Sequence, residues 1–222
     1  MLTIALPKGR LQAPALLRFA DAGLVPAEEP GSSRRLIVPA RSASARFLVL
    51  KDGDVPLYVE RGAADLGVCG LDQLLESGAD VLAPVDLGFG RCRLCVAAPR
   101  SRVSVDARGL SLEALADSAE PGRSLRVATK YPRLAARAFA RRGVPVDLLT
   151  LSGSVELAAV AGLADAIVDL VESGRTLEEN GLAIVEDLLA VSARLVVNRA
   201  AYRIKLDELL PLLERISPES AR

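Results

Sequence analysis

The sequence predicts an α/β fold with largely parallel sheets. Short apolar runs alternate with helical patterns along the whole chain, as is typical of strands joined by helical crossovers. The length of 222 residues allows one large or two small domains with their own cores. Half of the residues are hydrophobic and a quarter are charged, the usage of an ordinary globular protein.

The first half of the chain begins with an apolar strand, and Gly23 and Gly62 are expected to end the helices that follow. Asp54 is the expected N-cap of the second helix, with Pro56 tolerated in its first turn. Strands are expected at residues 2–6, 36–38, 46–50, 65–69, 81–87 and 91–98, and helices at residues 10–22, between 54 and 62, and at 71–76.

The second half repeats this rhythm. Strands are expected at residues 124–129, 146–151, 165–171, 184–189 and 193–197, and helices at residues 132–142, 155–161 and 201–216. The last helix has an apolar stripe, interpreted mainly as a packing face, made of Leu206, Leu209, Leu210 and Leu213. Residues 62–68 (GAADLGV) are similar to residues 162–168 (GLADAIV). This similarity indicates either two lobes of similar design or coincidence in a chain rich in Ala, Gly and Leu.

The charge balance and the absence of histidine exclude several functions. Lys and Arg number 28, as do Asp and Glu, so the chain has no basic field for nucleic acid and no cationic face for a membrane. Without histidine there is no Ser-His-Asp or Cys-His catalyst. The N-terminal segment does not have the pattern of a signal peptide, and no apolar run approaches the ~20 residues of a membrane span. The expected location is the cytoplasm.

The three cysteines do not form a disulfide framework or a complete metal site. Cys92 and Cys95 form a CxxC pair, but their spacing on an expected strand places them on opposite faces. A zinc site needs four ligands. We therefore expect these residues and Cys69 to be buried, reduced thiols and predict no protein-bound metal.

A phosphate-binding loop is predicted from Asp169 to Thr176. An apolar strand ends in a carboxylate, Asp169, and Ser173, Gly174, Arg175 and Thr176 follow at an expected helix start. Ligands of open α/β sheets bind beyond the carboxyl ends of strands. Backbone amides and hydroxyls in such a turn suit a phosphate, and a carboxylate suits sugar hydroxyls. The same residues also fit an ordinary capped turn, in which Thr176 and Glu179 form a capping box.

Two further stretches could carry chemistry. Lys8, Gly9 and Arg10 place two cations around a glycine at a strand-to-helix turn, which suits a polyphosphate, although solvated charges at a helix start are the simpler interpretation. Glycines within residues 54–72 suggest a close backbone approach at a strand end, or only a helix-turn-strand unit. The sequence contains neither a P-loop nor a GxGxxG pattern.

These stretches occur together and in order, and the chain thereby resembles the short form of the ATP phosphoribosyltransferase family from its first strand to its last helix. The resemblance is carried by residues 2–11 (LTIALPKGRL), 54–60 (DVPLYVE), 62–67 (GAADLG), 86–93 (DLGFGRCR), 126–132 (RVATKYP), 153–156 (GSVE), 162–177 (GLADAIVDLVESGRTL) and 192–195 (SARL). Each motif is modestly specific, whereas all of them in this order are highly specific.

The resemblance implies a transferase of histidine biosynthesis. The family transfers the phosphoribosyl group of 5-phosphoribosyl 1-pyrophosphate (PRPP) to N1 of ATP, gives N1-(5-phosphoribosyl)-ATP and pyrophosphate, and needs Mg²⁺. It also implies a bilobal fold of the periplasmic-binding-protein type (type II), two α/β lobes with the active site in the cleft. Lobe one would comprise residues 1–91 and 184–222, and lobe two, with the PRPP loop, residues 92–183.

The resemblance also implies roles for particular positions. In the family, the loop matching Ser173, Gly174, Arg175 and Thr176 binds the PRPP 5-phosphate, and the carboxylate matching Asp169 contacts the ribose. The residues expected on the ATP and pyrophosphate side are Lys8, Gly9, Arg10, Lys51, Asp72 and Glu156. Relatives often have Arg at the position of Lys51, and Lys keeps the charge without the bidentate geometry. No residue is assigned a catalytic role.

The short form also implies a partner, because the chain lacks the histidine-binding third domain of longer relatives. We expect a homodimer that assembles with a separate regulatory subunit resembling histidyl-tRNA synthetase. The alternative function is a non-catalytic cytoplasmic ligand-binding protein of the same bilobal fold. Another class of phosphoribosyltransferase is disfavoured, since the paired acidic PRPP motif on a strand is not present.

Overall fold

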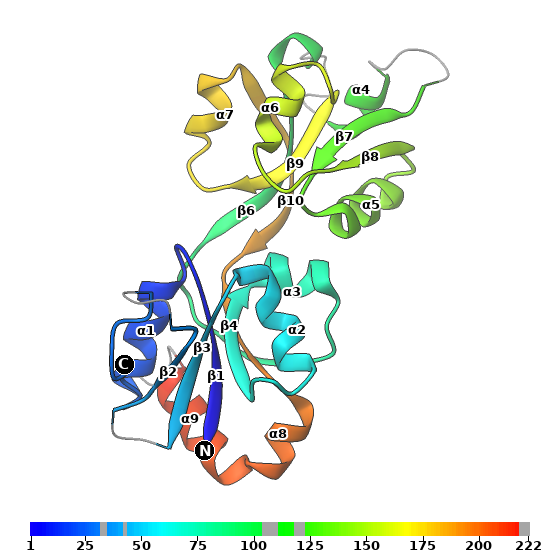
Figure 1. Ribbon diagram of the computed structural model, residues 1–222. Coiled ribbons are helices and arrows are strands. Elements are labelled where there is room, and N and C mark those ends of the chain that lie inside the picture. Colours follow the sequence, from blue (N-terminus) through cyan, green and yellow to red (C-terminus); the bar gives the residue numbers. More distant parts are fainter. Residues whose placement is uncertain (32–34, 42–43, 104–110, 118–122, 218–222) are drawn as a thin grey trace. The chain divides into compact units, whose positions relative to one another are not determined.

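The computed structural model describes residues 1–31, 35–41, 44–103, 111–117 and 123–217, which form two compact units (Figure 1). Unit 1 comprises Met1–Arg91 and Ser192–Arg222, and unit 2 comprises Cys92–Val191. Each unit is a β-sheet with helices packed against it, which confirms the predicted α/β class.

Unit 1 contains a six-stranded sheet with the order β2-β3-β1-β4-β11-β5. The strands are β1 (Leu2–Pro7), β2 (Ile37–Pro39), β3 (Ala45–Leu50), β4 (Leu66–Gly70), β5 (Leu82–Asp86) and β11 (Ala193–Val197). The helices are α1 (Gln12–Asp21), the 3₁₀ turn η1 (Asp52–Asp54), α2 (Val55–Glu60), α3 (Leu71–Ser77), α8 (Arg199–Ile204) and α9 (Leu206–Ile216). All residues of β1 are buried, as expected for a central parallel strand covered on both faces.

Unit 2 contains a five-stranded sheet with the order β10-β6-β9-β7-β8. The strands are β6 (Cys92–Pro99), β7 (Leu125–Thr129), β8 (Val146–Thr150), β9 (Ala166–Val171) and β10 (Leu182–Val191). The helices are the 3₁₀ turn η2 (Arg100–Arg102), α4 (Leu112–Asp117), α5 (Pro132–Arg141), α6 (Val155–Val160) and α7 (Arg175–Glu179). Separate apolar clusters around Phe139 and Val155 fill the space under α5 and α6.

The boundary at which the chain returns to unit 1 differs from the prediction. We expected residues 184–191 in the first lobe, whereas unit 2 continues to Val191. Strand β10 pairs antiparallel with β6 from Leu182, opposite Pro99, to Val191, opposite Cys92. Because this pairing extends over the whole of β6, the sheet of unit 2 retains these residues.

The sheets are mixed, so the prediction of largely parallel sheets is wrong in part. Parallel pairing is found between β1 and both β3 and β4, and between β7 and both β8 and β9. Strands β6 and β11 enter their sheets from the other unit and run antiparallel to both neighbours. Their direction is set by the passage of the chain between units. The alternation of strands and helices in the sequence does not predict the direction of such strands.

The two units have the same topology. Strands β3-β1-β4-β11-β5 correspond in order and direction to β8-β7-β9-β6-β10. Helices α2 and α6 occupy equivalent places, and residues 53–69 correspond one by one to residues 153–169. The similarity of residues 62–68 to residues 162–168 therefore accompanies a repeated structure.

The repeated segment turns from a helix into a strand through the same hydrogen bonds. Gly62 and Gly162 both have positive φ, of 72° and 74°, where a side chain would be strained. After them, the amide of Ala64 donates to the carbonyl of Tyr58, and that of Ala164 to the carbonyl of Ala158. An aspartate follows in each unit and immediately precedes the strand.

Each of these aspartates holds the neighbouring central strand through its carboxylate. Asp65 accepts the backbone N–H of Thr3 at 2.8 Å, and Asp165 accepts that of Arg126 at 3.0 Å. The cations around them differ between the units. Lys205 binds Asp65 at 2.8 Å, whereas Asp165 is surrounded by arginines.

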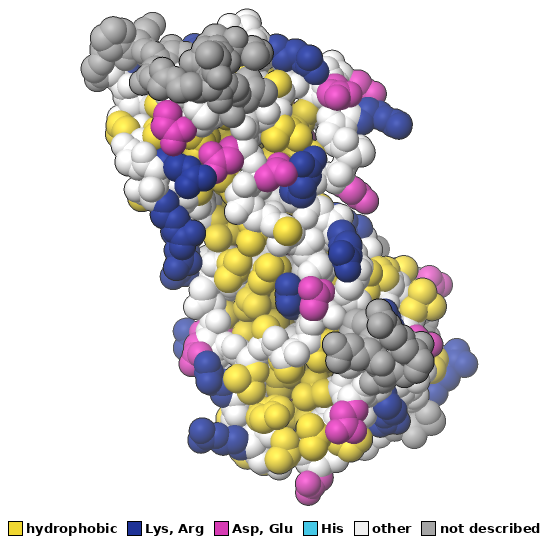
Figure 2. All heavy atoms as spheres, turned by 180° about the vertical axis from the view of Figure 1, so that it is seen from behind, with side chains coloured by type: hydrophobic (Ala, Val, Ile, Leu, Met, Phe, Trp, Pro, Cys, Tyr) yellow, Lys and Arg dark blue, Asp and Glu magenta, His cyan; other side chains and the backbone are white. Residues whose placement is uncertain are grey.

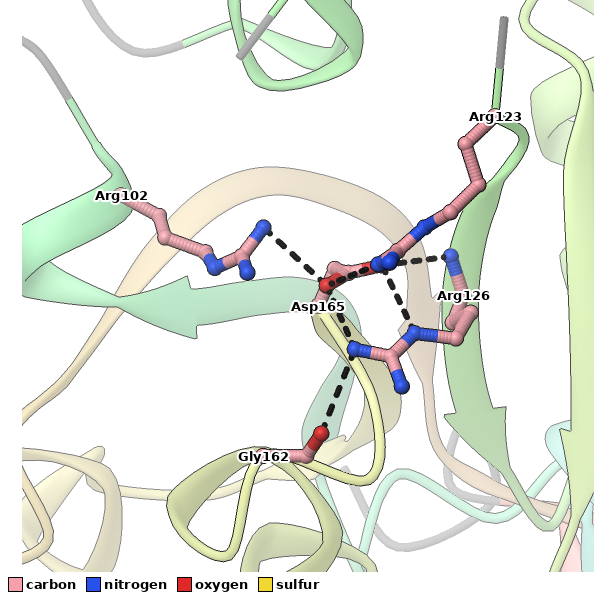
Figure 3. Close-up of polar contacts among 5 residues, drawn as sticks. All are labelled: Arg102, Arg123, Arg126, Gly162 and Asp165. Carbon is pink, nitrogen blue, oxygen red and sulfur yellow. Dashed lines mark hydrogen bonds and ion pairs between the residues drawn. The ribbon is translucent and has the colours of Figure 1, made fainter. Parts of the chain in front are cut away.

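Asp165 is bound by three guanidinium groups (Figure 3). Arg102, Arg123 and Arg126 approach its oxygens at 3.0, 3.1 and 3.0 Å, and its side chain is fully buried. Burial alone would raise the pKa of Asp165. The hydrogen bonds from Arg126 and Arg123 and the charge of Arg102 outweigh it, and hold the pKa well below its usual value.

The C-terminal helical region differs from the single predicted helix at residues 201–216. It forms α8 and α9, separated at Lys205, whose ammonium binds Asp65 and the carbonyl of Met1. The predicted stripe is also partly wrong, since Leu206 and Leu210 are 39% and 44% exposed. The buried side of α9 consists of Leu209, Leu212, Leu213 and Ile216. Both sets have helical spacing, so spacing alone did not distinguish them.

The surface carries charges of both signs. Figure 2 shows Lys and Arg side chains interspersed with Asp and Glu over one face, in keeping with the balanced composition. Among the described residues, no helix has the length and apolar character needed to cross a membrane.

Candidate functional site

A pocket of about 240 Å³ lies at the carboxyl end of β9 in unit 2. Its walls are formed by Glu156, Asp169, Leu170, Val171, Glu172, Ser173, Gly174, Thr176 and Leu177. Asp169 is half-buried, and its Oδ1 accepts the backbone N–H of Leu170 at 2.8 Å. The structure thus brings Asp169, Ser173, Gly174 and Thr176 of the predicted loop together around one cavity.

The loop enters α7 through Gly174, whose φ is 82°. This left-handed conformation favours glycine, and it turns the chain so that the first amides of α7 start beside the pocket. Ser173 Oγ accepts the N–H of Arg175 at 3.4 Å, and Arg175 itself is exposed and outside the pocket walls. The capping-box interpretation is wrong: Gly174 is the N-cap, without a side-chain cap, and the exposed Thr176 lies inside the helix.

Glu156 lines this same pocket, in the first turn of α6. The resemblance groups it with the residues of the ATP and pyrophosphate side, which are otherwise in unit 1. Ser154 immediately precedes α6 with φ 48° and is the one non-glycine with positive φ in the described part of the chain. Such a conformation is uncommon for serine, and here it directs the chain into the helix that carries Glu156.

The remaining predicted residues lie at one edge of the unit 1 sheet. Lys8 follows β1, Lys51 follows β3 and Asp72 follows β4 in the first turn of α3. Because β1 is parallel to both β3 and β4, their carboxyl ends share this edge. Gly9 and Arg10 are exposed beside Lys8, whereas Asp72 is only 2% exposed.

Asp52 belongs to this edge and was missed in the sequence, as was Glu172 in the pocket. Burial and the charge of Asp72 raise the pKa of Asp52 to about 6, against the opposing effects of the Gly70 amide and Arg10. The only sequence signal was its place directly after Lys51, at a strand end. That position does not show that Asp72 would lie nearby.

The cysteines are free and buried. Burial, with the nearby charges of Asp52 and Asp72, raises the pKa of the Cys69 thiol well above its usual value. Cys95 donates a hydrogen bond to Asp187 at 3.1 Å, and burial together with this carboxylate raises its pKa to about 12. A raised pKa leaves less thiolate at neutral pH, and the thiolate is the nucleophile and the metal ligand.

Comparison with known proteins gives consistent results. A family model described as ATP phosphoribosyltransferase (HisG) matches residues 51–218. The chain is 45% identical over 219 residues to the ATP phosphoribosyltransferase of Acidithiobacillus ferrooxidans, covering 98% of this chain and 97% of the relative. It is 48% identical over 216 residues to that of Moorella thermoacetica, covering 97% and 92%.

Solved structures support the fold. One of them is the ATP phosphoribosyl transferase (HisG:HisZ) complex from Thermotoga maritima, with a TM-score of 0.80 and 31% identity over 97% of this chain and 96% of that chain. The periplasmic VFT2 domain of Bordetella pertussis BvgS has a TM-score of 0.56 at 16% identity, covering 97% of this chain and 86% of that one. The second likeness concerns the fold alone, and confirms the predicted periplasmic-binding-protein type.

Proposed function

Because the chain belongs to the ATP phosphoribosyltransferase family, we propose that it transfers the phosphoribosyl group of PRPP to N1 of ATP and releases pyrophosphate. This reaction is the first step of histidine biosynthesis, and its substrates are cytoplasmic metabolites. The observation that carries the proposal is the unit 2 pocket, in which hydroxyls, helix-start amides and a carboxylate surround one cavity at a strand end.

The pocket suits the phosphoribosyl part of PRPP. Ser173, Gly174 and Thr176 offer hydroxyls and backbone amides, which hydrogen-bond phosphate oxygens without adding a cation. Asp169 and Glu156 are acceptors for ribose hydroxyls. The carboxylates come from β9 and α6, and the phosphate donors come from the loop before α7 and from α7 itself.

The unit 1 edge suits the nucleotide and pyrophosphate groups. Lys8, Arg10 and Lys51 are exposed cations at the ends of neighbouring strands. Lys51 acts as a point charge on phosphate, without the paired hydrogen bonds of an arginine. Asp72 is buried, so we assign it to holding this edge in place.

The chemistry needs little from side chains that exchange protons. N1 of adenine is already a nucleophile, and the difficult step is the development of positive charge at the ribose carbon as pyrophosphate leaves. Positioning of the two substrates and neutralisation of the leaving group contribute most of the acceleration. Mg²⁺ enters as part of the substrate, bound to its phosphates, and protein carboxylates such as those of the pocket are ligands that it accepts.

We expect the purified protein, with its partner if one is required, to form N1-(5-phosphoribosyl)-ATP from ATP, PRPP and Mg²⁺. Product formation is followed by absorbance and verified by mass. A non-catalytic ligand-binding protein of the same fold would bind a ligand without making product. Folded protein with a verified partner that gives no product would therefore contradict the proposal.

We further propose that a HisZ-type subunit regulates the chain. The Thermotoga maritima structure is a complex of HisG with HisZ, and this chain aligns with 96% of the matched chain in it. The relative from Acidithiobacillus ferrooxidans is covered to 97% and so has almost the same length. These observations support a short-form enzyme, which we expect to be a dimer within a hetero-oligomer.

Histidine is expected to inhibit the complex but not the chain alone, because coupling between ligands requires a second site, here on a second protein. The measurement is activity against histidine concentration, with and without the partner. Adding the partner with its histidine site disabled is the control. Full activity and full inhibition of the chain by itself would exclude the short-form assignment.

A further inference from the structure

Two carboxyl groups are packed together at the unit 1 edge. Asp52, in η1, lies against β4 and α3, and Asp72 is in the first turn of α3. The carboxylate of Asp72 folds back over Gly70, where a Cβ would come within 2.1 Å of its Oδ1. The Oδ1 atom of Asp52 is buried and has no hydrogen-bond partner among the described residues. Asp52 is therefore poorly solvated and close to a negative charge.

The groups that act on Asp52 come from several elements. Strand β4 contributes the Cys69 thiol and the Gly70 amide, which donates to the Asp52 carboxylate, α3 contributes Asp72, and the turn after β1 contributes Arg10. On its own segment, Lys51 and Asp54 are exposed. Burial and the negative charge of Asp72 favour the protonated form of Asp52, whereas the positive charge of Arg10 favours the ionised form. The pKa of Asp52 is therefore raised to about 6.

We propose that the binding of substrate phosphates at this edge is coupled to the uptake of a proton by Asp52. The inference rests on the proposed function, in which Arg10 and Lys8 receive the nucleotide or pyrophosphate. An anion next to Arg10 neutralises the cation that favours the ionised form of Asp52. It also adds a negative charge that disfavours this form directly.

The sign of the coupling follows from linkage. Well below pH 6, Asp52 already holds its proton, so binding takes up no proton there. Above pH 6 the free protein has lost the proton and must recover it on binding, so affinity falls as pH rises until the pKa of the bound state is reached. Each pKa unit of increase on binding corresponds to about a tenfold loss of affinity across this range.

Asp52→Asn tests the coupling, because asparagine is a neutral analogue of the protonated acid. We expect it to bind Mg-ATP as tightly as the wild type at pH 5.5 and several-fold to about tenfold more tightly at pH 8. Titration calorimetry in buffers of different ionisation enthalpy should show proton uptake at pH 7 that is larger in the wild type than in the variant. Asp54→Asn, which removes an exposed carboxyl from the same turn, is the matched control and should behave as the wild type.

Asp52→Ser is a second neutral variant, for use if the asparagine variant does not fold. Serine is chosen because Ser152 occupies the corresponding position of unit 2. Equal affinities of the wild type and a neutral variant at pH 8, with product formation intact, would overturn the coupling and leave the proposed function standing. Failure of the folded wild type, with its partner, to bind Mg-ATP even at pH 5.5 would overturn both.

Discussion

Asp165→Asn is expected to lower the free energy of unfolding by about 3–5 kcal/mol, the usual cost of breaking a buried ion pair. The asparagine amide would place its own N–H groups against Arg102, Arg123 and the backbone N–H of Arg126, all of which are donors. The Asp165 side chain is fully buried, whereas those of the arginines are 30–40% exposed, so water can compensate only on the arginine side. For a chain of this length, the loss corresponds to roughly 6–20 °C in melting temperature.

The matched control is Asp65→Asn at the corresponding position of unit 1. Asp65 accepts the N–H of Thr3 and binds one cation, Lys205, instead of three. We therefore expect a smaller loss, measured by urea denaturation with a spectroscopic signal from each unit. Equal losses in the two variants would show that the three arginines add nothing to the shared backbone hydrogen bond.

The pH dependence of the Asp165 variant provides a further check. The pKa of Asp165 is lowered in the folded protein, so its contribution is fully present above the ordinary value near 3.8 and is lost only in more acidic solution. The difference in stability between wild type and variant should accordingly be constant from about pH 5 to pH 8. A difference that disappears already near pH 6 would show that another group is responsible.

Asp169→Asn and Thr176→Ala are expected to weaken PRPP binding by roughly ten- to hundredfold, with much smaller effects on ATP. Each change removes a charge-assisted hydrogen bond, donated to the phosphate by the Thr176 hydroxyl or accepted from the ribose by the Asp169 carboxylate, worth about 1.5–3 kcal/mol. Both side chains line the unit 2 pocket, whereas the cations assigned to ATP are in unit 1. The measurement is the dissociation constant of each substrate, with activity as a second measure.

Asp147→Asn and Thr150→Ala are suitable controls, because they make the same chemical changes at exposed positions of β8 outside the pocket. They should leave both affinities unchanged. If the pocket variants lose affinity for PRPP and ATP equally, or keep both affinities, the loop serves only to begin α7.

The loop that lines the unit 2 pocket could be predicted because its parts are neighbours in the sequence. Asp169 lies near the carboxyl end of β9 and Thr176 lies in the first turn of α7, so the strand end and the helix start place them at one cavity with little help from the rest of the chain. Glu156 reaches the same cavity from α6. Its position depends on the packing of α6 beside β9, and spacing within residues 153–156 contains no information on that packing.

The roles of Lys205 and Asp52 also depend on residues that are distant in the sequence. The pattern at residues 201–216 fits one helix, but the ammonium of Lys205 binds the buried Asp65, and the helix is interrupted there. Asp52 is an ordinary acidic residue in the sequence. Its proton affinity is raised only because η1 packs against β4 and α3, which removes water and adds Asp72.

The sequence by itself determined the α/β class and the family, and it predicted the loop that lines the unit 2 pocket. These depend on local periodicity, on turn residues and on motifs in a fixed order, which the chain carries irrespective of its folding partners. Only the tertiary structure decided the mixed direction of the sheets, the inclusion of β10 in unit 2, the buried side of α9 and the charge environments of Asp165 and Asp52. Strand pairing, desolvation and Coulomb interactions act between residues that are close in space, and distance along the chain does not specify which residues those are.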